Sequence, residues 1–444
     1  MSSLARHLAL AAVAAIALSA SAGAQLLGVS ALPPVALPVP TGNLPVAGPV
    51  LQNILSQPAA QQAISPTLDT VSGLTSTVAE AGAPTLLELR RLRLQELIRS
   101  NRAAVESDGN GLPVRRGIVA VIDPDPLGLQ RALSAGFRVA SDDRDLALGM
   151  RVVSLAAPNR MSARDGLKLL RKRAPELQAD FDHLFEPAGA GLVPMAGALA
   201  AAQASGAGPA IGVIDGGVAS HPSLAGKSIE QRGFAGSPQP TGHGTAVASL
   251  LVGTQSPFRG GAPGARLFVA DVYGGNRAAG SATSIVRAFG WLSSHRPQVI
   301  NISLVGPPNK LVERAIQLVE ARGIQVVAAV GNDGPAAPPQ YPASYPGVVS
   351  VTAVDARGRA LPEAGKAAHI DFAAPGADMA AALPGQGYTR VRGTSFAAPL
   401  AAARLLLAGS PMGLAAEARP GKGRVGRGIV CGACRIDPRS VGAR

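Results

Sequence analysis

Three polar residues in this sequence are of the types that together perform nucleophilic catalysis. Asp215 directly follows the apolar run 210–214, and His243 lies between two glycines. Ser395 shortly precedes the mostly apolar segment 400–407. A serine hydroxyl is a weak nucleophile at neutral pH, so it needs an adjacent base, and that base needs an orienting partner. The sequence therefore predicts a site in which His243 takes the proton of Ser395 while Asp215 holds the imidazole.

Such chemistry also needs donors for the oxyanion that forms during acyl transfer. Asn332 follows the apolar run 324–330, and its side-chain amide is one predicted donor. The backbone N–H of Ser395 is the other. Taken singly, these residues have ordinary structural explanations: Asp215 as a cap, His243 as a structural residue, and Asn332 as a turn residue in Gly-Asn-Asp-Gly. Their joint occurrence favours catalysis.

The segments around these residues predict a doubly wound α/β fold with a mostly parallel sheet. Short apolar runs, typical of strands buried on both faces, alternate with stretches that suit helices. The predicted strands are 210–214, 267–270, 299–302, 324–330 and 348–354, and the clearest predicted helices are 283–293 and 310–322. Functional groups gather at the carboxyl ends of such strands, where Asp215 and Asn332 stand. His243 and Ser395 are both expected at helix N-termini, where backbone N–H groups point outward.

Four short motifs resemble those of subtilisin-like serine proteases. They are Ile-Gly-Val-Ile-Asp at 211–215, Gly-His-Gly-Thr at 242–245, Gly-Asn at 331–332 and Gly-Thr-Ser-Phe-Ala-Ala-Pro at 393–399. The chain order Asp, His, Ser also matches, and the resemblance covers about 195–410. It implies a subtilisin-like catalytic domain, and a secreted serine endopeptidase that hydrolyses peptide bonds through an acyl-enzyme intermediate.

The same resemblance implies where peptide or protein substrates bind. The segment 300–304 resembles the one whose edge pairs with the substrate backbone, and 328–330 resembles the other wall of the primary specificity pocket. The expected substrate-binding residues are Ser303, Leu304, Val305, Ala328, Ala329, Val330 and Gly331. Their apolar character predicts small or medium apolar side chains before the scissile bond. Val305 stands where the family usually has Gly, so its branched side chain is expected to narrow the pocket.

Residues 85–187 are predicted to form a separate propeptide-like domain. A helix is expected over 85–106, stopped by Asp-Gly-Asn-Gly at 108–111. The order strand, helix, strand, strand, helix, strand follows over 112–187, as in a small ferredoxin-like α+β unit. The resemblance implies that this domain inhibits the active site from within the chain until it is cleaved between about 185 and 204.

The first part of the chain predicts export. Residues 1–24 combine a short polar start, an apolar run of 11 residues and a small-residue cleavage site, which is typical of a signal peptide. That run is shorter than the roughly 20 residues needed to span a bilayer. The Pro- and Ala-rich stretch 25–84 predicts a linker. No transmembrane segment is expected, and the protein is predicted to be secreted or periplasmic.

Residues 411–444 predict a basic tail that carries the two cysteines of the chain, Cys431 and Cys434. A local disulfide is favoured over a redox motif or a zinc site. The net charge is +13, but neither a basic stripe with aromatics nor a reading motif accompanies it, so no nucleic-acid partner is expected. No cofactor is predicted. The sequence has no acidic, Gly-centred calcium loop, although the resemblance is compatible with structural calcium held by scattered loop oxygens.

Two functions of other classes compete with the protease. The first is an exported, protease-like binding or scaffold protein without activity, and it conflicts with the presence of every expected catalytic residue. The second is a nucleic-acid binder that uses the basic tail, which would show steeply salt-dependent binding. Nothing in the sequence outside the tail supports that second alternative.

Overall fold

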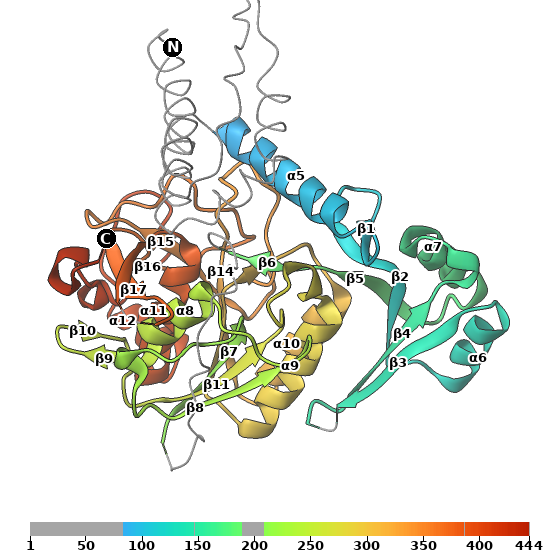
Figure 1. The fold of residues 1–444 in the computed structure, drawn as a ribbon, viewed down its shortest axis with the longest axis horizontal. Coiled ribbons are helices and arrows are strands. Elements are labelled where there is room, and N and C mark those ends of the chain that lie inside the picture. The colour runs from blue at the N-terminus through green and yellow to red at the C-terminus, as the bar shows by residue number, and fades with distance from the viewer. Residues whose placement is uncertain (1–82, 146, 189–207, 386, 444) are drawn as a thin grey trace, which may run out of the picture. The chain divides into compact units, whose positions relative to one another are not determined.

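The computed structural model describes residues 83–145, 147–188, 208–385 and 387–443 (Figure 1). The predicted signal peptide 1–24 lies outside the described residues, and so does the predicted linker up to residue 82. Within the described ranges, no helix has both the length and the hydropathy needed to cross a bilayer.

A long helix and a small antiparallel sheet form the N-terminal part (Figure 1). Its elements are α5 (Ala83–Ser100), β1 (Val105–Ser107), β2 (Pro113–Ile122), α6 (Pro126–Ser134), β3 (Arg138–Asp145), β4 (Met150–Ala156), α7 (Ala163–Arg173) and β5 (Gln178–His183). The strand order is β5-β2-β4-β3, and β1 pairs with the start of β2. Helices α6 and α7 pack on the sheet through a shared core that includes Val119, Val121, Ala132, Leu155 and Leu167.

The prediction of a helix over 85–106 is wrong at its C-terminal end. α5 ends at Ser100, where the Asn101 side-chain amide donates to the Leu97 carbonyl oxygen at 2.9 Å. Val105 is then fully buried in β1. Pairing with β2 and burial of Val105 outweigh the local helical spacing, which carries no information about a distant strand.

A seven-stranded parallel sheet forms the centre of the C-terminal part. Its strand order is β16-β15-β14-β12-β7-β11-β8, and all neighbouring pairs are parallel. The strands are β7 (Ala210–Asp215), β8 (Ile229–Gly233), β11 (Arg266–Asp271), β12 (Val299–Ile302), β14 (Gln325–Ala329), β15 (Val349–Val354) and β16 (Phe372–Pro375). The five predicted strands are confirmed. No prediction covers β8 and β16, because β8 is a largely polar edge strand and β16 is short and ends in proline.

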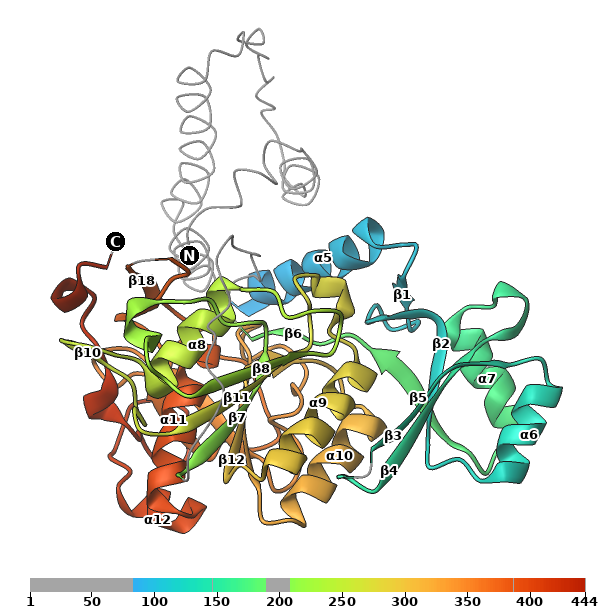
Figure 2. The same cartoon turned by 60° about the horizontal axis from the view of Figure 1, so that its bottom comes forward.

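Helices cover both faces of this sheet (Figures 1 and 2). Two lie on one side, α8 (Gly242–Val252) and α11 (Thr394–Ala408), and two on the other, α9 (Ala282–His295) and α10 (Lys310–Glu320). Small side chains let α11 approach the sheet closely, since its many alanines are fully buried. The arrangement confirms the predicted doubly wound α/β class.

The segment predicted as a basic tail packs against the C-terminal part instead of extending from it. Bridges join Arg359 to Lys422 and Ala373 to Ile429, and Val430 is buried. Cys431 and Cys434 form a disulfide. The remaining short elements of this part are β9 (Thr254–Gln255), β10 (Phe258–Arg259), β17 (Met379–Ala382), β18 (Tyr388–Val391) and α12 (Pro411–Ala416).

The chain passes from the small sheet directly onto the C-terminal part. After β5, Glu186–Pro187 form strand β6, which pairs antiparallel with β13 (Leu304–Val305). Pro187 lies opposite Leu304, and Glu186 lies opposite Val305. The end of the predicted propeptide is therefore paired with the segment predicted to bind substrate.

Candidate active site

Asp215 and His243 are in direct contact. Asp215 is the last residue of β7, and its Oδ1 lies 2.9 Å from His243 Nδ1. The same oxygen accepts the Gly216 backbone N–H at 2.7 Å. Both side chains are fully buried. Because an ionised carboxylate only accepts hydrogen bonds, Nδ1 is assigned the proton, which leaves Nε2 as the accepting nitrogen of the imidazole.

The N-terminus of α8 positions His243. Thr241 caps this helix, because its Oγ1 accepts the Gly244 N–H at 3.0 Å. A Cβ at position 244 would lie 2.3 Å from the Gly216 carbonyl oxygen. Only glycine therefore lets the start of α8 come this close to the end of β7, and that approach brings the imidazole to Asp215.

Ser395 lies in the first turn of α11 and is fully buried. The preceding Gly393 has a φ of 140°, a conformation that favours glycine. The centroid of the Phe396 ring lies 5.4 Å from that of His243, so the starts of α8 and α11 meet. Ser395 Oγ and His243 Nε2 are both buried without a hydrogen-bond partner among the described residues. They are the two atoms between which the predicted proton transfer runs, and such bonds often tighten only when substrate is bound.

Asn332 joins α11 to the N-terminal segment. Its Oδ1 accepts the Thr394 N–H at 3.0 Å, and its Nδ2 donates to the Ala188 carbonyl oxygen. Thr394 Oγ1 accepts the Gly331 N–H at 3.0 Å. These bonds orient the amide so that an N–H points at a peptide carbonyl. The role of Asn332 as an oxyanion donor stays a prediction.

Residues 184–188 are held between two edges of the C-terminal part. On one side β6 pairs with β13, and the Ala188 N–H donates to the Ser303 carbonyl oxygen at 2.8 Å. On the other side the Phe185 N–H donates to the Gly280 carbonyl oxygen at 2.7 Å. Main-chain bonds on both sides are the way in which an extended peptide binds at a sheet edge. Ala188 and Phe185 are themselves buried.

The residues predicted to bind substrate form two adjoining segments. Ser303 Oγ donates to the Ser395 carbonyl oxygen at 2.9 Å, and Leu304 and Val305 form β13. The other segment comprises the fully buried Ala328, Ala329 and Val330, followed by Gly331. A Cβ at position 331 would lie 3.2 Å from Val305 Cγ1, so Val305 fills space between the two segments, as expected of a branched residue there. Their binding roles stay predictions.

Sequence reasoning missed a cluster of charges around Glu186. Arg93 of α5 donates from Nε to Glu186 Oε2 at 3.1 Å and from Nη2 to Asp333 Oδ1 at 3.0 Å. Arg277 Nη2 lies 3.0 Å from Glu186 Oε1, and Arg90 Nε lies 3.0 Å from Asp333 Oδ2. Burial alone raises the pKa of Glu186, but Arg93 and Arg277 outweigh it and hold that pKa below its usual range. No local signal predicts contacts between residues that are 91 or more positions apart in the chain.

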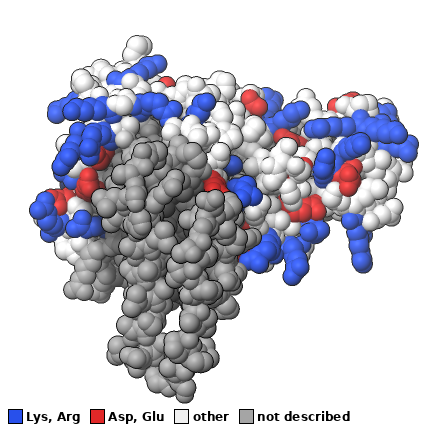
Figure 3. All heavy atoms as spheres, turned by 90° about the horizontal axis from the view of Figure 1, so that it is seen from above, with Lys and Arg blue, Asp and Glu red and all other residues white. Residues whose placement is uncertain are grey.

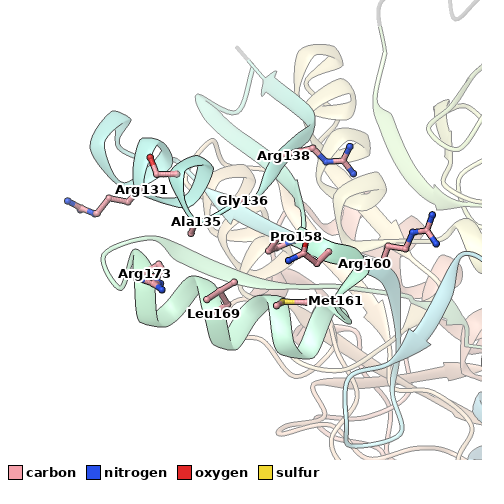
Figure 4. A pocket seen from close by; sticks show the side chains of 11 residues that line it. Arg131, Ala135, Gly136, Arg138, Pro158, Arg160, Met161, Leu169 and Arg173 are labelled. Atoms are coloured by element: carbon pink, nitrogen blue, oxygen red, sulfur yellow. The ribbon is translucent and has the colours of Figure 1, made fainter.

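Arg and Lys side chains also gather in places away from the predicted site residues. A hollow at α6 and α7 contains none of the predicted site residues, and its lining includes Arg131, Arg138, Arg160 and Arg173 (Figure 4). Lys and Arg side chains are also spread over the visible described surface (Figure 3). In the part of the chain that the structure describes, no group of three or more His, Cys, Asp or Glu is arranged to hold a metal ion.

The side chains of Ser395, His243 and Asp215 are of the three types that a serine hydrolase uses, and they stand at the starts of α11 and α8 and at the end of β7. A model of the Subtilase family matches residues 206–412. Subtilisin Savinase of Lederbergia lenta is 33% identical over 200 residues, which are 44% of this chain and 74% of that protein. Subtilisin DY of Bacillus licheniformis is 32% identical over 225 residues, 48% of this chain and 82% of that protein. The chain belongs to the subtilase family of serine endopeptidases.

Two further comparisons define the extent of this likeness. The match to an alkaline protease of Shouchella clausii, at 33% identity, spans 52% of that protein and 44% of this chain. The crystal structure of fervidolysin from Fervidobacterium pennivorans, a keratinolytic enzyme related to subtilisin, aligns with a TM-score of 0.59 and 20% identity. It covers 72% of this chain and 61% of fervidolysin, and at that identity it supports the fold alone.

Proposed function

We propose that this chain is an exported subtilase zymogen that cleaves itself between Ala188 and Gly189. In this proposal Asp215, His243, Ser395 and Asn332 are the catalytic residues. The observation that carries it is the hydrogen bond from Asn332 Nδ2 to the Ala188 carbonyl oxygen. That bond distinguishes one peptide carbonyl of the chain, next to the first turn of α11, which carries the predicted nucleophile Ser395.

The proposed reaction begins with attack of Ser395 Oγ on the Ala188 carbonyl carbon. His243 Nε2 takes the hydroxyl proton, while Asp215 holds Nδ1 and stabilises the imidazolium. Asn332 Nδ2 donates to the oxyanion. The imidazolium then gives its proton to the Gly189 nitrogen as the peptide bond breaks. Water, deprotonated by the same imidazole, releases Ala188 from its ester with Ser395.

The N-terminal part is well suited to act as an intramolecular inhibitor. Residues 184–188 take the place of a peptide substrate between β13 and the segment that holds Gly280. α5 adds ion pairs to Asp333, which directly follows Asn332. A segment bound in this manner blocks access for other peptides until it is cleaved and dissociates from the site. Export rests on the signal-peptide pattern of residues 1–24.

The test is mass spectrometry of the full chain beside its Ser395→Ala variant. We expect the wild-type protein to yield a fragment that begins at Gly189 and the variant to stay joined at that bond. Ser134→Ala, the same substitution at an exposed position at the end of α6 and outside the site, serves as a matched control and should process normally. A mature fragment that begins at a residue far from 189 would contradict the proposed cleavage site.

Labelling by a fluorophosphonate probe separates the protease from the scaffold alternative. An active serine reacts covalently with this probe, so the processed wild-type protein should be labelled and Ser395→Ala should not. Failure of the wild-type protein both to process and to react would favour an inactive protease-like scaffold.

A further inference from the structure

Glu186 occupies the third position before the Ala188–Gly189 bond, and its environment is unusual for an acidic side chain. The residue is only 5% exposed. A carboxylate buried to this extent is costly unless cations or hydrogen bonds compensate for lost hydration. The groups that contact it therefore define what this part of the site accepts.

Two cations contact the Glu186 carboxylate, and they lie on opposite sides of the proposed cleavage point in the chain. Arg93 belongs to α5, which would leave with the N-terminal part. Arg277 begins the short 3-10 helix Arg277–Ala279, between β11 and α9, and stays in the processed enzyme. Its Nη2 lies 3.0 Å from Glu186 Oε1, and its side chain is 36% exposed. After cleavage, the site therefore retains Arg277, one of the two cations that contact the Glu186 carboxylate.

We propose that Arg277 is a specificity-determining residue that favours peptides with an acidic side chain at the third position before the scissile bond. This inference rests on the proposed function, because it takes residues 185–188 to bind as a substrate does. The guanidinium contacts the side chain of that position directly, through a charge-assisted hydrogen bond. Glutamate should be preferred to aspartate, since the shorter side chain falls one methylene short of the same contact.

The carboxylate of Asp333 repels an acidic side chain at the third position and so opposes this preference. It binds Nη2 of Arg93 while Glu186 binds Nε, so the guanidinium of Arg93 separates the two carboxylates. Coulomb energy falls with distance, so the direct contact with Arg277 outweighs the more remote repulsion. A basic side chain at the third position would face Arg277 instead and be disfavoured.

The test compares two internally quenched peptides with the processed full-chain enzyme. Their sequences are Leu-Phe-Glu-Pro-Ala-Gly, which copies residues 184–189, and Leu-Phe-Gln-Pro-Ala-Gly. We expect kcat/KM to favour the Glu peptide by about five- to tenfold at low ionic strength, as for a partly exposed charge pair. The difference should lie mainly in KM, because the contact is remote from the reacting carbonyl, and it should shrink with added salt.

Variants assign the effect to Arg277. Arg277→Gln should bring the ratio to about one, and Arg277→Glu should favour a peptide with Lys at the third position. Arg314→Gln, on the exposed side of α10, is the matched control and should keep the wild-type ratio. Equal kcat/KM for both peptides in the wild type, or a preference that survives Arg277→Gln, overturns the inference while the proposed function stands. Failure to hydrolyse either peptide, with no difference from Ser395→Ala, overturns both.

Discussion

The Asn332 side chain makes two hydrogen bonds that have different roles at the residue scale. Oδ1 accepts the N–H of Thr394 and fixes the orientation of the amide against α11. Nδ2 then donates to the Ala188 carbonyl oxygen. The acceptor oxygen thus positions the amide, and in the proposed reaction the hydrogen bond from the donor nitrogen strengthens as negative charge develops on the carbonyl.

We expect Asn332→Ala to lower kcat by about 10²–10³, the loss known for removal of one such donor from a subtilisin, with little change in KM. Steady-state hydrolysis of the Glu peptide measures both constants. Asn332→Asp is the informative companion, since it keeps an acceptor for Thr394 and removes the donor. If both variants raised KM and left kcat intact, Asn332 would bind the ground state only.

At the scale of elements, α5 contributes to the site although it lies outside the small sheet. Arg90 and Arg93 are three residues apart and so share a helix face. Both contact Asp333, and Leu86, one turn earlier, is 5% exposed and packs at Gly334. The helix thus anchors the N-terminal part at the loop that follows β14.

We expect Arg93→Ala to loosen the segment in the site, because Glu186 and Asp333 are both buried and both lose a partner. The cost should be about 1–2 kcal/mol, below that of a fully buried pair, since the Arg93 side chain is 39% exposed. Hydrogen exchange of residues 184–188, measured in the uncleaved Ser395→Ala protein, should speed up. Arg99→Ala, which removes only a surface pair with Glu96, should leave that exchange unchanged.

At the scale of the whole described molecule, β5 joins the N-terminal and C-terminal parts through carboxylates. Asp182 accepts the N–H of Thr283 at 2.9 Å and its hydroxyl at 2.8 Å, and Asp180 accepts the N–H of Lys310 at 2.9 Å. Thr283 and Lys310 stand in the first turns of α9 and α10, where negative charge is favoured. These hydrogen bonds, together with the ion pairs of Glu186, hold the two parts together.

The lowered pKa of Glu186 predicts a loss of stability in acid. The pKa of Glu186 is lower in the folded protein than its ordinary value of 4.5. The ionised carboxylate therefore contributes fully to the free energy of unfolding above pH 4.5, and this contribution is lost as the pH falls through the pKa of the folded protein. In the Ser395→Ala protein, Glu186→Gln should therefore lower the melting temperature at pH 7. The difference between the two proteins should narrow below about pH 4.5. A difference that stays constant down to pH 3 would exclude this ionisation as the cause.

The sequence by itself determined the features that depend on residues close together in the chain. Strands buried on both faces appear as short apolar runs, which is why β7, β11, β12, β14 and β15 could be predicted. The glycines beside His243 likewise indicate a close backbone approach, which Gly244 makes to the Gly216 carbonyl oxygen. Where the local pattern competed with a distant partner, as at Val105, the prediction failed.

Only the tertiary structure decided what lies around the Ala188 carbonyl. Arg93 of α5 and Arg277 of the short 3-10 helix both contact Glu186, and Arg93 also contacts Asp333 in the loop after β14, through contacts that span from 91 to 240 residues. Hydrophobic periodicity and turn chemistry depend on neighbours in the chain, whereas the pairing of charges depends on where the folded sheets bring those charges. The sequence therefore predicts the groups of an acyl-transfer site, and the fold determines which side chains surround residues 186–188.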